Sequence, residues 1–461
     1  MAAVPPDLGT AAARPDPEAA GSPQGAGTRP RVLFICADPV GEQMAGLGIR
    51  CWELARALSA HAAVTVAHGG SEQGEREGVR TIAFRPHAPD ALKEPIARAD
   101  VVIAHPQWPL VDRWLRRSAA RVIVDLYCPE TLETLELLAG GRALERRQRT
   151  ATTLDRLHAA LRTGHNFICA SETQRDLWLG AMLALRMIGP GLYDHDPSLR
   201  EIIDLVPFGL PETPPGAAPG AAGRGPREAI AALEPDSEIV LWNGGIWSWL
   251  DAESAIRAAA ALAERRPKAR LVFMGVAAEH PAGAAAAEAA RRLAGELGVL
   301  DTVVHFHDWI PYAERGAWLT QAACAISAAG EHLETRFAYR TRLLDCFWAG
   351  LPVVCTSGDD LAERVEREQL GAVAAPGDVE GLAAALERVL ARGREAYAPA
   401  LRAAAERQTW PLVAQPIIRW ISQPTPPDRP GDGPEVLRAS LAQRLREGAY
   451  LAGGRALLAR R

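Results

Sequence analysis

The sequence lacks the features of secreted, membrane-spanning and nucleic-acid-binding proteins. Its seven cysteines are scattered, odd in number and never form a C-x-x-C pair, so neither a disulfide framework nor a zinc site is indicated. No apolar run is long enough to cross a bilayer, and the N-terminus has acidic residues and prolines where a signal peptide is basic and then apolar. The net charge of −5 gives no reason to expect nucleic acid as a partner. We expect a cytoplasmic protein that is either soluble or peripheral at the inner face of the membrane.

Segments without apolar periodicity divide the chain. Residues 1–30 are rich in Ala, Pro and Gly and predict a disordered leader. Residues 212–225 have a similar composition and predict a flexible linker between two domains. The expected order is a leader at 1–30, an N-terminal domain at 31–211, a linker at 212–225, a C-terminal domain at 226–409, a crossover helix at 410–421 and a linker with a basic amphipathic helix at 422–461.

The N-terminal segment alternates short apolar runs with stretches of helical spacing, which predicts an α/β domain. It opens with a buried strand at Val32–Cys36, a loop that contains Gly46 and Gly48, and a helix at Ile49–Leu58. The full G-x-G-x-x-G spacing is absent, and no acidic residue ends the next strand. We therefore reject a nicotinamide dinucleotide site.

The C-terminal segment repeats this alternation. A strand at Glu238–Trp242 leads into the turn Asn243-Gly244-Gly245, and Asp251 is placed to cap the following helix. The sequence therefore predicts two doubly wound, Rossmann-like domains that face a central cleft. Ligands are expected at the carboxyl ends of both sheets.

The stretch from Gly330 to Asp360 contains the densest group of candidate ligands. It predicts a polar loop with Glu331 and Glu334, a helix at Ala338–Trp348 and a buried strand at Val353–Thr356. Carboxylates can accept hydrogen bonds from sugar hydroxyls, while arginines and the N–H groups at a helix start can bind phosphate. This combination suits a sugar nucleotide. An ordinary αβ unit with a solvated charged face would show the same pattern.

Two residues end strands of the N-terminal domain, where side chains point into a cleft. His105 follows Val101–Ala104 and precedes Pro106, which favours a functional role over that of a core histidine. Asp125 ends the run Val122–Val124. It either binds acceptor hydroxyls, takes part in catalysis or caps the following helix.

Residues 31 to 421 resemble the glycosyltransferases of the two-Rossmann-domain (GT-B) class, and more narrowly the retaining family 4. The resemblance rests on the glycine turn after Asn243, on Ala104-His105-Pro106 and on two further motifs, A-G-L-P-V-V at Ala349–Val354 and P-x-D-x-x-x-L-A-x-A-L at Pro376–Leu386. It implies transfer of a sugar from a nucleoside-diphosphate sugar to a hydroxyl acceptor, with retention of the anomeric configuration. The acceptor would be a glycan, a lipid-linked saccharide or a small metabolite.

The sequence departs from the family pattern in two places. Family 4 has two glutamates separated by seven residues; the second position falls on Asp345, whereas the first falls on Phe337, with Glu334 and Glu331 nearby. The Arg and Lys that follow the glycine turn and grip the pyrophosphate are also absent. The substitutes that we predict for these two cations are Arg336, Arg340 and Arg342.

The resemblance assigns roles to a limited set of residues. Trp247 is either core packing or, as we favour, a stacking platform. No D-x-D stretch lies in a cleft loop, so we expect no metal and no cofactor beyond the sugar nucleotide. The candidate catalytic residues are His105, Asp125, Arg340 and Arg342, and the candidate donor-binding residues are Gly46, Gly48, Gly244, Gly245, Trp247, Glu331, Glu334, Arg336 and Asp345.

Alternatives to a transferase remain at this stage. A non-catalytic relative would keep the fold for binding or assembly, and a GT-B epimerase or phosphorylase would work without an acceptor alcohol. The basic amphipathic segment from Pro434 to Arg461 either docks on its own domain or a second subunit, or contacts anionic lipid.

Overall fold

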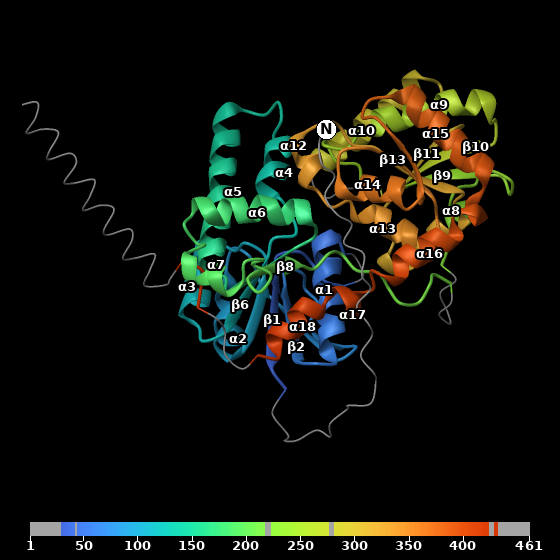
Figure 1. The fold of residues 1–461 in the computed structure, drawn as a ribbon. Coiled ribbons are helices and arrows are strands. Elements are labelled where there is room, and N and C mark those ends of the chain that lie inside the picture. The colour runs from blue at the N-terminus through green and yellow to red at the C-terminus, as the bar shows by residue number, and fades with distance from the viewer. Residues whose placement is uncertain (1–28, 42–43, 217–222, 276–280, 424–427, 432–461) are drawn as a thin grey trace, which may run out of the picture.

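The computed structural model describes residues 29–41, 44–216, 223–275, 281–423 and 428–431. Each half of the chain folds around its own mainly parallel sheet with helices on both faces, and the two halves face each other (Figure 1). This confirms the predicted pair of Rossmann-like domains. Nearly all of the predicted leader and the basic C-terminal segment lie outside the described residues.

The N-terminal domain is built on an eight-stranded sheet in the order β3-β4-β2-β1-β5-β6-β7-β8. All neighbouring strands are parallel except the pair β3 and β4. Its strands are β1 (Arg31–Cys36), β2 (Ala63–His68), β3 (Gly74–Arg76), β4 (Val79–Ala83), β5 (Val101–Ala104), β6 (Arg121–Asp125), β7 (Asn166–Cys169) and β8 (Ile203–Leu205). Its helices are α1 (Gly46–Ser59), the short 3-10 turn Pro89–Leu92, α2 (Lys93–Arg98), α3 (Pro109–Arg117), α4 (Glu130–Leu137), α5 (Ala143–Thr163), α6 (Glu172–Ala184) and α7 (Pro190–His195).

The C-terminal domain has a fully parallel six-stranded sheet in the order β11-β10-β9-β12-β13-β14. Its strands are β9 (Glu238–Asn243), β10 (Ala269–Met274), β11 (Val304–His307), β12 (Cys324–Ser327), β13 (Val353–Thr356) and β14 (Gly371–Ala374). Its helices are α8 (Pro226–Ala229), α9 (Ala252–Arg265), α10 (Pro281–Glu296), α11 (Arg315–Gln321), α12 (Leu333–Phe337), α13 (Thr341–Trp348), α14 (Asp360–Arg367), α15 (Val379–Arg392) and α16 (Ala398–Glu406), with 3-10 turns at Tyr312–Glu314 and Arg394–Ala396.

The strand sequences are apolar on both faces because both faces are covered. Residues 32–36 of β1 are each at most 2% exposed, and Phe34 lies in register with Val66 and Ile103 on the neighbouring strands. A parallel strand between two helix layers therefore has a continuous run of apolar residues.

In the second domain, the carboxylate of Asp251 accepts a hydrogen bond from the N–H of Ser254 and caps α9, as expected.

The predicted helix at Ala338–Trp348 is wrong at its start. Residues 333–337 form the separate helix α12, Ala338 is extended, and α13 begins only at Thr341. Arg340 stands at the N-cap of α13 because its side chain is bound to Asp359 and to the carbonyl oxygen of Thr356. The break places two charged segments, α12 and the start of α13, on the cleft.

The predicted glycine loop is also partly helical. Helix α1 begins at Gly46, so Gly46 and Gly48 lie in its first turn. A Cβ atom on Gly48 would lie 2.4 Å from the carbonyl oxygen of Pro39, whereas a Cβ on Gly46 would meet no atom within 4 Å. Gly48 therefore permits the close approach of α1 to the loop after β1.

The chain returns to the N-terminal domain after α16. Leu210 and Trp410 are joined by a backbone hydrogen bond of 3.1 Å, and the Trp410 ring lies 4.8 Å from that of Phe208. The predicted crossover helix is two helices, α17 (Trp410–Val413) and α18 (Gln415–Ile421), and α17 packs against α1 (Figure 1). These contacts fix one edge of the cleft.

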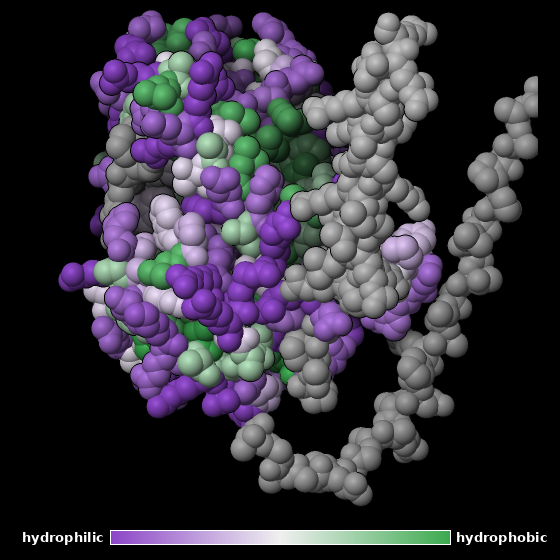
Figure 2. Space-filling model, turned by 90° about the vertical axis from the view of Figure 1, so that its left-hand side faces the viewer, coloured by the Kyte–Doolittle hydropathy of each residue, from purple (hydrophilic) through white to green (hydrophobic). Residues whose placement is uncertain are grey.

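The side of the molecule that carries α5 and α6 has a mostly hydrophilic surface (Figure 2). The exception is a hollow in the upper half of this view, where hydrophobic residues gather. Among the helices of the described residues, none has the length and apolar character that a membrane span requires.

We predict that Gly48→Ala lowers the free energy of unfolding by about 1–3 kcal/mol, because the added methyl group overlaps the Pro39 carbonyl. Gly46→Ala is the matched control in the same helical turn. It should leave stability unchanged or raise it slightly, because alanine restricts the unfolded chain. Urea denaturation of both variants measures the difference. Equal stability of Gly48→Ala and the wild type would contradict this packing argument.

Candidate active site

A cavity of about 530 Å³ lies between the two domains at the carboxyl ends of their strands. The N-terminal domain contributes the loop after β1, the start of α1 and the loop after β6. The C-terminal domain contributes the turn after β9 and the segment from α12 to α13. This is the cleft that the doubly wound pattern predicted.

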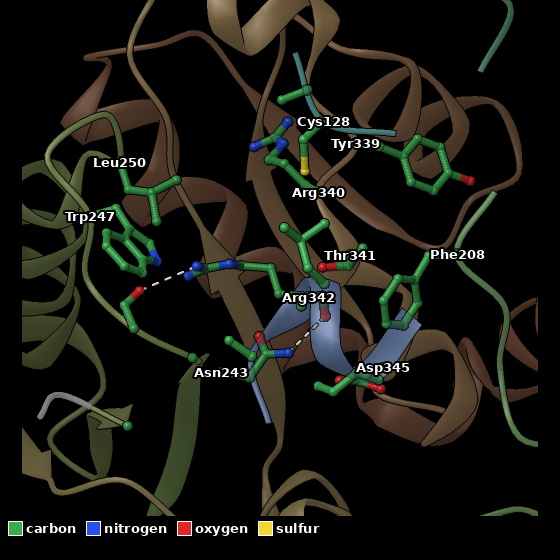
Figure 3. A pocket seen from close by; sticks show the side chains of 18 of the residues that line it. Cys128, Phe208, Asn243, Trp247, Leu250, Tyr339, Arg340, Thr341, Arg342 and Asp345 are labelled. Atoms are coloured by element: carbon green, nitrogen blue, oxygen red, sulfur yellow. Dashed lines mark hydrogen bonds between the residues drawn. The ribbon is translucent and has the colours of Figure 1, made fainter. Parts of the chain in front are cut away.

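Arg342 lies beside the glycine turn of the C-terminal domain. Its Nη2 donates a hydrogen bond to the Gly245 carbonyl oxygen at 3.2 Å, and its own carbonyl oxygen accepts one from Asn243 Nδ2 at 2.7 Å (Figure 3). Its Nη1 is buried without a hydrogen-bond partner, and no carboxylate of the described residues pairs with it. Burial, together with the nearby Arg340, lowers the pKa of Arg342 to about 10. Arg342 is therefore still protonated at neutral pH, as a half-buried cation without a counterion among the described residues.

Arg340 also lines the cavity, but its charge is compensated. Its guanidinium pairs with the buried carboxylate of Asp359 and donates to the Thr356 carbonyl oxygen at 2.6 Å. In Figure 3 the guanidinium of Arg340 is directed away from that of Arg342. Of the two arginines predicted at the start of this helix, Arg342 alone has an unneutralised charge.

Glu331 and Arg336 do not line the cavity. Both are exposed at the two ends of the α12 segment, and the Arg336 guanidinium lies 5.6 Å from the centroid of the Phe337 ring. The short helix α12 turns its other side inward. This explains why Glu334, which lies between them, is buried and faces the cavity.

Glu334 faces a second carboxyl group from the other domain. Burial raises the pKa of Glu334 to about 8, and the nearby Glu133 on α4 adds to the shift. Burial and Glu130 raise the pKa of Glu133 to about 7. Both side chains line the cavity, so it contains two carboxyl groups that hold protons near neutral pH.

Asp125 and His105 lie behind the cavity wall, contrary to their predicted orientation into the cleft. Asp125 forms a two-pronged ion pair with Arg50, at 2.7 and 3.2 Å, and accepts a hydrogen bond from the Tyr127 N–H. His105 Nε2 lies 3.6 Å from Asp125, and burial lowers the pKa of this histidine. Neither residue lines the cavity. The sequence did not indicate this pair, because the helical pattern around Arg50 gives no sign that its guanidinium is buried.

Of the remaining predicted residues, all but one line the cavity. Gly46, Gly244, Gly245, Trp247 and Asp345 line the cavity, whereas Gly48 does not. Gly244 has a φ of 125°, which only glycine adopts readily, so its turn depends on the absence of a side chain.

Trp247 stacks on a second tryptophan at the rim of the glycine turn. Its ring is nearly parallel to that of Trp249, with the centroids 5.2 Å apart, and both rings line the cavity. A flat aromatic surface on a cavity wall can stack with a base or a sugar ring.

Arg315 is a cavity residue that the sequence analysis missed. Its Nε lies 3.4 Å from Asp345 Oδ1, and its guanidinium stacks 3.6 Å from the centroid of the Tyr312 ring and 4.7 Å from that of Trp348. Burial raises the pKa of Asp345, and Arg315 opposes that rise. No motif marks Arg315 in the sequence, because its partner is 30 residues away.

Comparison with known families identifies the domain that carries Arg342. Residues 237–392 match the family model described as glycosyl transferases group 1. The chain is a glycosyltransferase with the GT-B fold. No curated protein sequence matches it.

Solved structures share the fold of this glycosyltransferase. Anabaena HepE in complex with UDP-glucose is 13% identical, with a TM-score of 0.60, and the match covers 85% of this chain and 99% of HepE. Sucrose-phosphate synthase from Thermosynechococcus elongatus is 18% identical, with a TM-score of 0.60 and coverage of 85% and 98%. The E. coli trehalose-6-phosphate protein bound with UDP-2-fluoro glucose is 14% identical, with a TM-score of 0.60 and coverage of 85% and 99%.

We predict that Glu334→Gln flattens the pH dependence of stability between about pH 5 and 8. The folded-state pKa of about 8 lies above the usual value of 4.5, so in this window the folded state holds a proton that the unfolded state has lost. The contribution of Glu334 to stability is therefore greatest at low pH and falls as the pH rises toward 8. Glutamine cannot titrate, which removes this part of the decline.

The measurement is the thermal midpoint of wild type and variant at intervals from pH 5 to 9. Glu331→Gln, an exposed glutamate on the same segment, serves as control and should keep the wild-type profile. A Glu334→Gln profile parallel to that of the wild type would show that Glu334 is not a buried acid.

Proposed function

We propose that this glycosyltransferase moves a sugar from a nucleoside-diphosphate sugar to a hydroxyl acceptor, with retention at the anomeric carbon and without a divalent metal. The observation that carries the proposal is the uncompensated charge of Arg342 beside the glycine turn, where its Nη1 is buried without a hydrogen-bond partner. Removing part of a cation from water without giving it a partner costs free energy, and a diphosphate would relieve that cost.

The geometry around Arg342 suits a diphosphate. Nη1 has free hydrogen-bonding capacity, and the open Gly244-Gly245 turn lets a ligand approach the backbone. Negative charge grows on the diphosphate as the glycosidic bond breaks, so a cation fixed at this place stabilises the transition state more than the ground state. In this role arginine replaces the Arg and Lys that follow the glycine turn in family 4, and it supplies the charge that a metal would otherwise provide.

Other cavity residues supply the remaining contacts with the donor. Asp345, oriented by Arg315, is placed to accept hydrogen bonds from ribose hydroxyls. Glu334, protonated at neutral pH, can both donate and accept hydrogen bonds with sugar hydroxyls. Retention rests on the resemblance to family 4, and a uridine donor is suggested by HepE, which was solved with UDP-glucose.

The test of this function is a panel of UDP-, ADP-, GDP- and dTDP-sugars in buffer that contains a metal chelator. The matching donor should raise the thermal midpoint, because a ligand that binds only the folded state stabilises it. The same donor should release nucleoside diphosphate in the presence of an alcohol, and NMR of the product should show the anomeric configuration of the donor. Donor binding without turnover would instead favour the non-catalytic alternative. Turnover that needs added magnesium or manganese would contradict the metal-free proposal.

Arg342→Ala should lower kcat on the order of 10²-fold or more, by analogy with the loss of one oxyanion-hole donor. Arg342→Lys should rescue only part of the rate, because lysine lacks the two parallel N–H groups. Arg340→Ala is the contrasting variant. It leaves the buried Asp359 carboxylate unpaired and should chiefly lower the free energy of unfolding, by about 3–5 kcal/mol. A near-normal kcat in Arg342→Ala would refute the assignment of Arg342.

A further inference from the structure

Among the described residues that line it, the N-terminal wall of the cavity contains no cation. Its apolar lining includes Met44, Leu47 and Phe208. Two acidic residues, Asp38 and Glu133, are among the described residues of this wall. Its other titratable groups are a tyrosine and a thiol, which burial keeps neutral. This wall therefore combines apolar surface with carboxyl groups.

Two arginines of the N-terminal domain that do not line the cavity are neutralised by carboxylates. Arg50 is paired with Asp125 at 2.7 Å, and Arg156 is paired with Glu130 at 2.8 Å. None of these four residues lines the cavity. An anionic group on an acceptor would consequently find no countercharge here among the described residues.

Asp38 is open to a cationic partner. It lies in the loop after β1, two residues beyond Cys36, and its carboxylate makes no hydrogen bond or ion pair with the part of the chain that the structure describes. The titratable group that acts on it is His105, which burial keeps neutral. Glu133, the second acid, accepts a hydrogen bond from the thiol of Cys128. Burial raises its pKa to about 7, and an ammonium group beside it would favour its charged form.

The opposite wall has the reverse charge. Arg315, Arg340 and Arg342 line it, and Arg342 is the cation without a partner. Opposite charges on two walls of one cavity orient a pair of ligands, with the anionic ligand on the C-terminal side and the cationic or neutral ligand on the N-terminal side. The diphosphate of the donor is the anionic ligand.

We propose, on the basis of the transferase function above, that the acceptor is an alcohol with an apolar face and a protonated amine, and without phosphate or carboxylate. Its apolar face packs on Met44, Leu47 and Phe208, and its ammonium group binds to Asp38 and Glu133. One hydroxyl oxygen of the acceptor forms the new bond to the anomeric carbon. The bond from that carbon to the diphosphate oxygen breaks, and the hydroxyl proton leaves with the nucleoside diphosphate. The amine binds and takes no part in this exchange.

The test uses phenyl glycosides that carry a hydroxyl, an amine or a phosphate at each ring position in turn, with the donor identified by the sugar-nucleotide panel. For at least one position, kcat/KM for the amine should exceed that for the matched hydroxyl by about tenfold or more, because the ammonium meets a carboxylate in a partly desolvated site. Phosphate-bearing acceptors should give no transfer. Amines that are no better than the hydroxyls, or a preference for phosphate, would overturn the proposal.

Isosteric variants test whether Asp38 and Glu133 cause the preference for amine-bearing acceptors. Asp38→Asn and Glu133→Gln should each reduce the amine-to-hydroxyl ratio of kcat/KM, and the double variant should bring it close to one. Glu145→Gln, which removes an exposed acid on α5, is the matched control and should keep the wild-type ratio. A donor-induced rise in thermal midpoint shows that each variant is folded. An unchanged ratio in the double variant would overturn the assignment of these two acids.

The same experiment separates the two proposals. Slow release of nucleoside diphosphate to water, without any acceptor, reports the transferase function alone. If no sugar nucleotide binds or is turned over, the proposed function fails. If donors are turned over while phosphate-bearing acceptors are preferred, the transferase function stands and the acceptor class is wrong.

Discussion

The buried ion pair between Arg50 and Asp125 holds the N-terminal side of the cleft together. The guanidinium of Arg50 is fully buried, and it binds Asp125 at the end of β6 and the carbonyl oxygens of Val206 and Pro207 after β8. It therefore ties α1 to two strand ends across the sheet. The Arg50 guanidinium also lies 4.6 Å from the centroid of the Tyr127 ring, so the ion pair supports a residue that lines the cavity. Loss of either charge would leave the other buried and unpaired, which is among the costliest changes in a protein interior.

The cavity differs from its surroundings in how charges are compensated. Most buried arginines near it have a carboxylate partner, as Arg340 has Asp359 and Arg315 has Asp345. Arg342 has none among the described residues. Burying a lone charge lowers stability, so such a site persists where binding or chemistry uses it. The diphosphate proposed above would supply the counterion that Arg342 lacks.

Loops of both domains set the shape of the site, and apolar periodicity says least about loops. The two-domain fold, the order of strands and helices and the cap at Asp251 followed from apolar periodicity and local hydrogen-bonding chemistry. The start of α13 did not, because the pairing of Arg340 with Asp359 overrides the helical pattern before Thr341. His105 and Asp125 were placed at strand ends correctly, yet they face Arg50 rather than the cavity.

The sequence by itself determined the two Rossmann-like domains, the cleft at the carboxyl ends of their strands and the glycine turn after Asn243, because these depend on local periodicity and backbone freedom. Only the tertiary structure decided which ionisable residues face the cavity and which neutralise each other behind it. Arg50 and Asp125 are 75 residues apart, and Arg315 and Asp345 are 30 apart. Pairing over such separations depends on how the sheets and helices pack, and no local pattern in the chain encodes it.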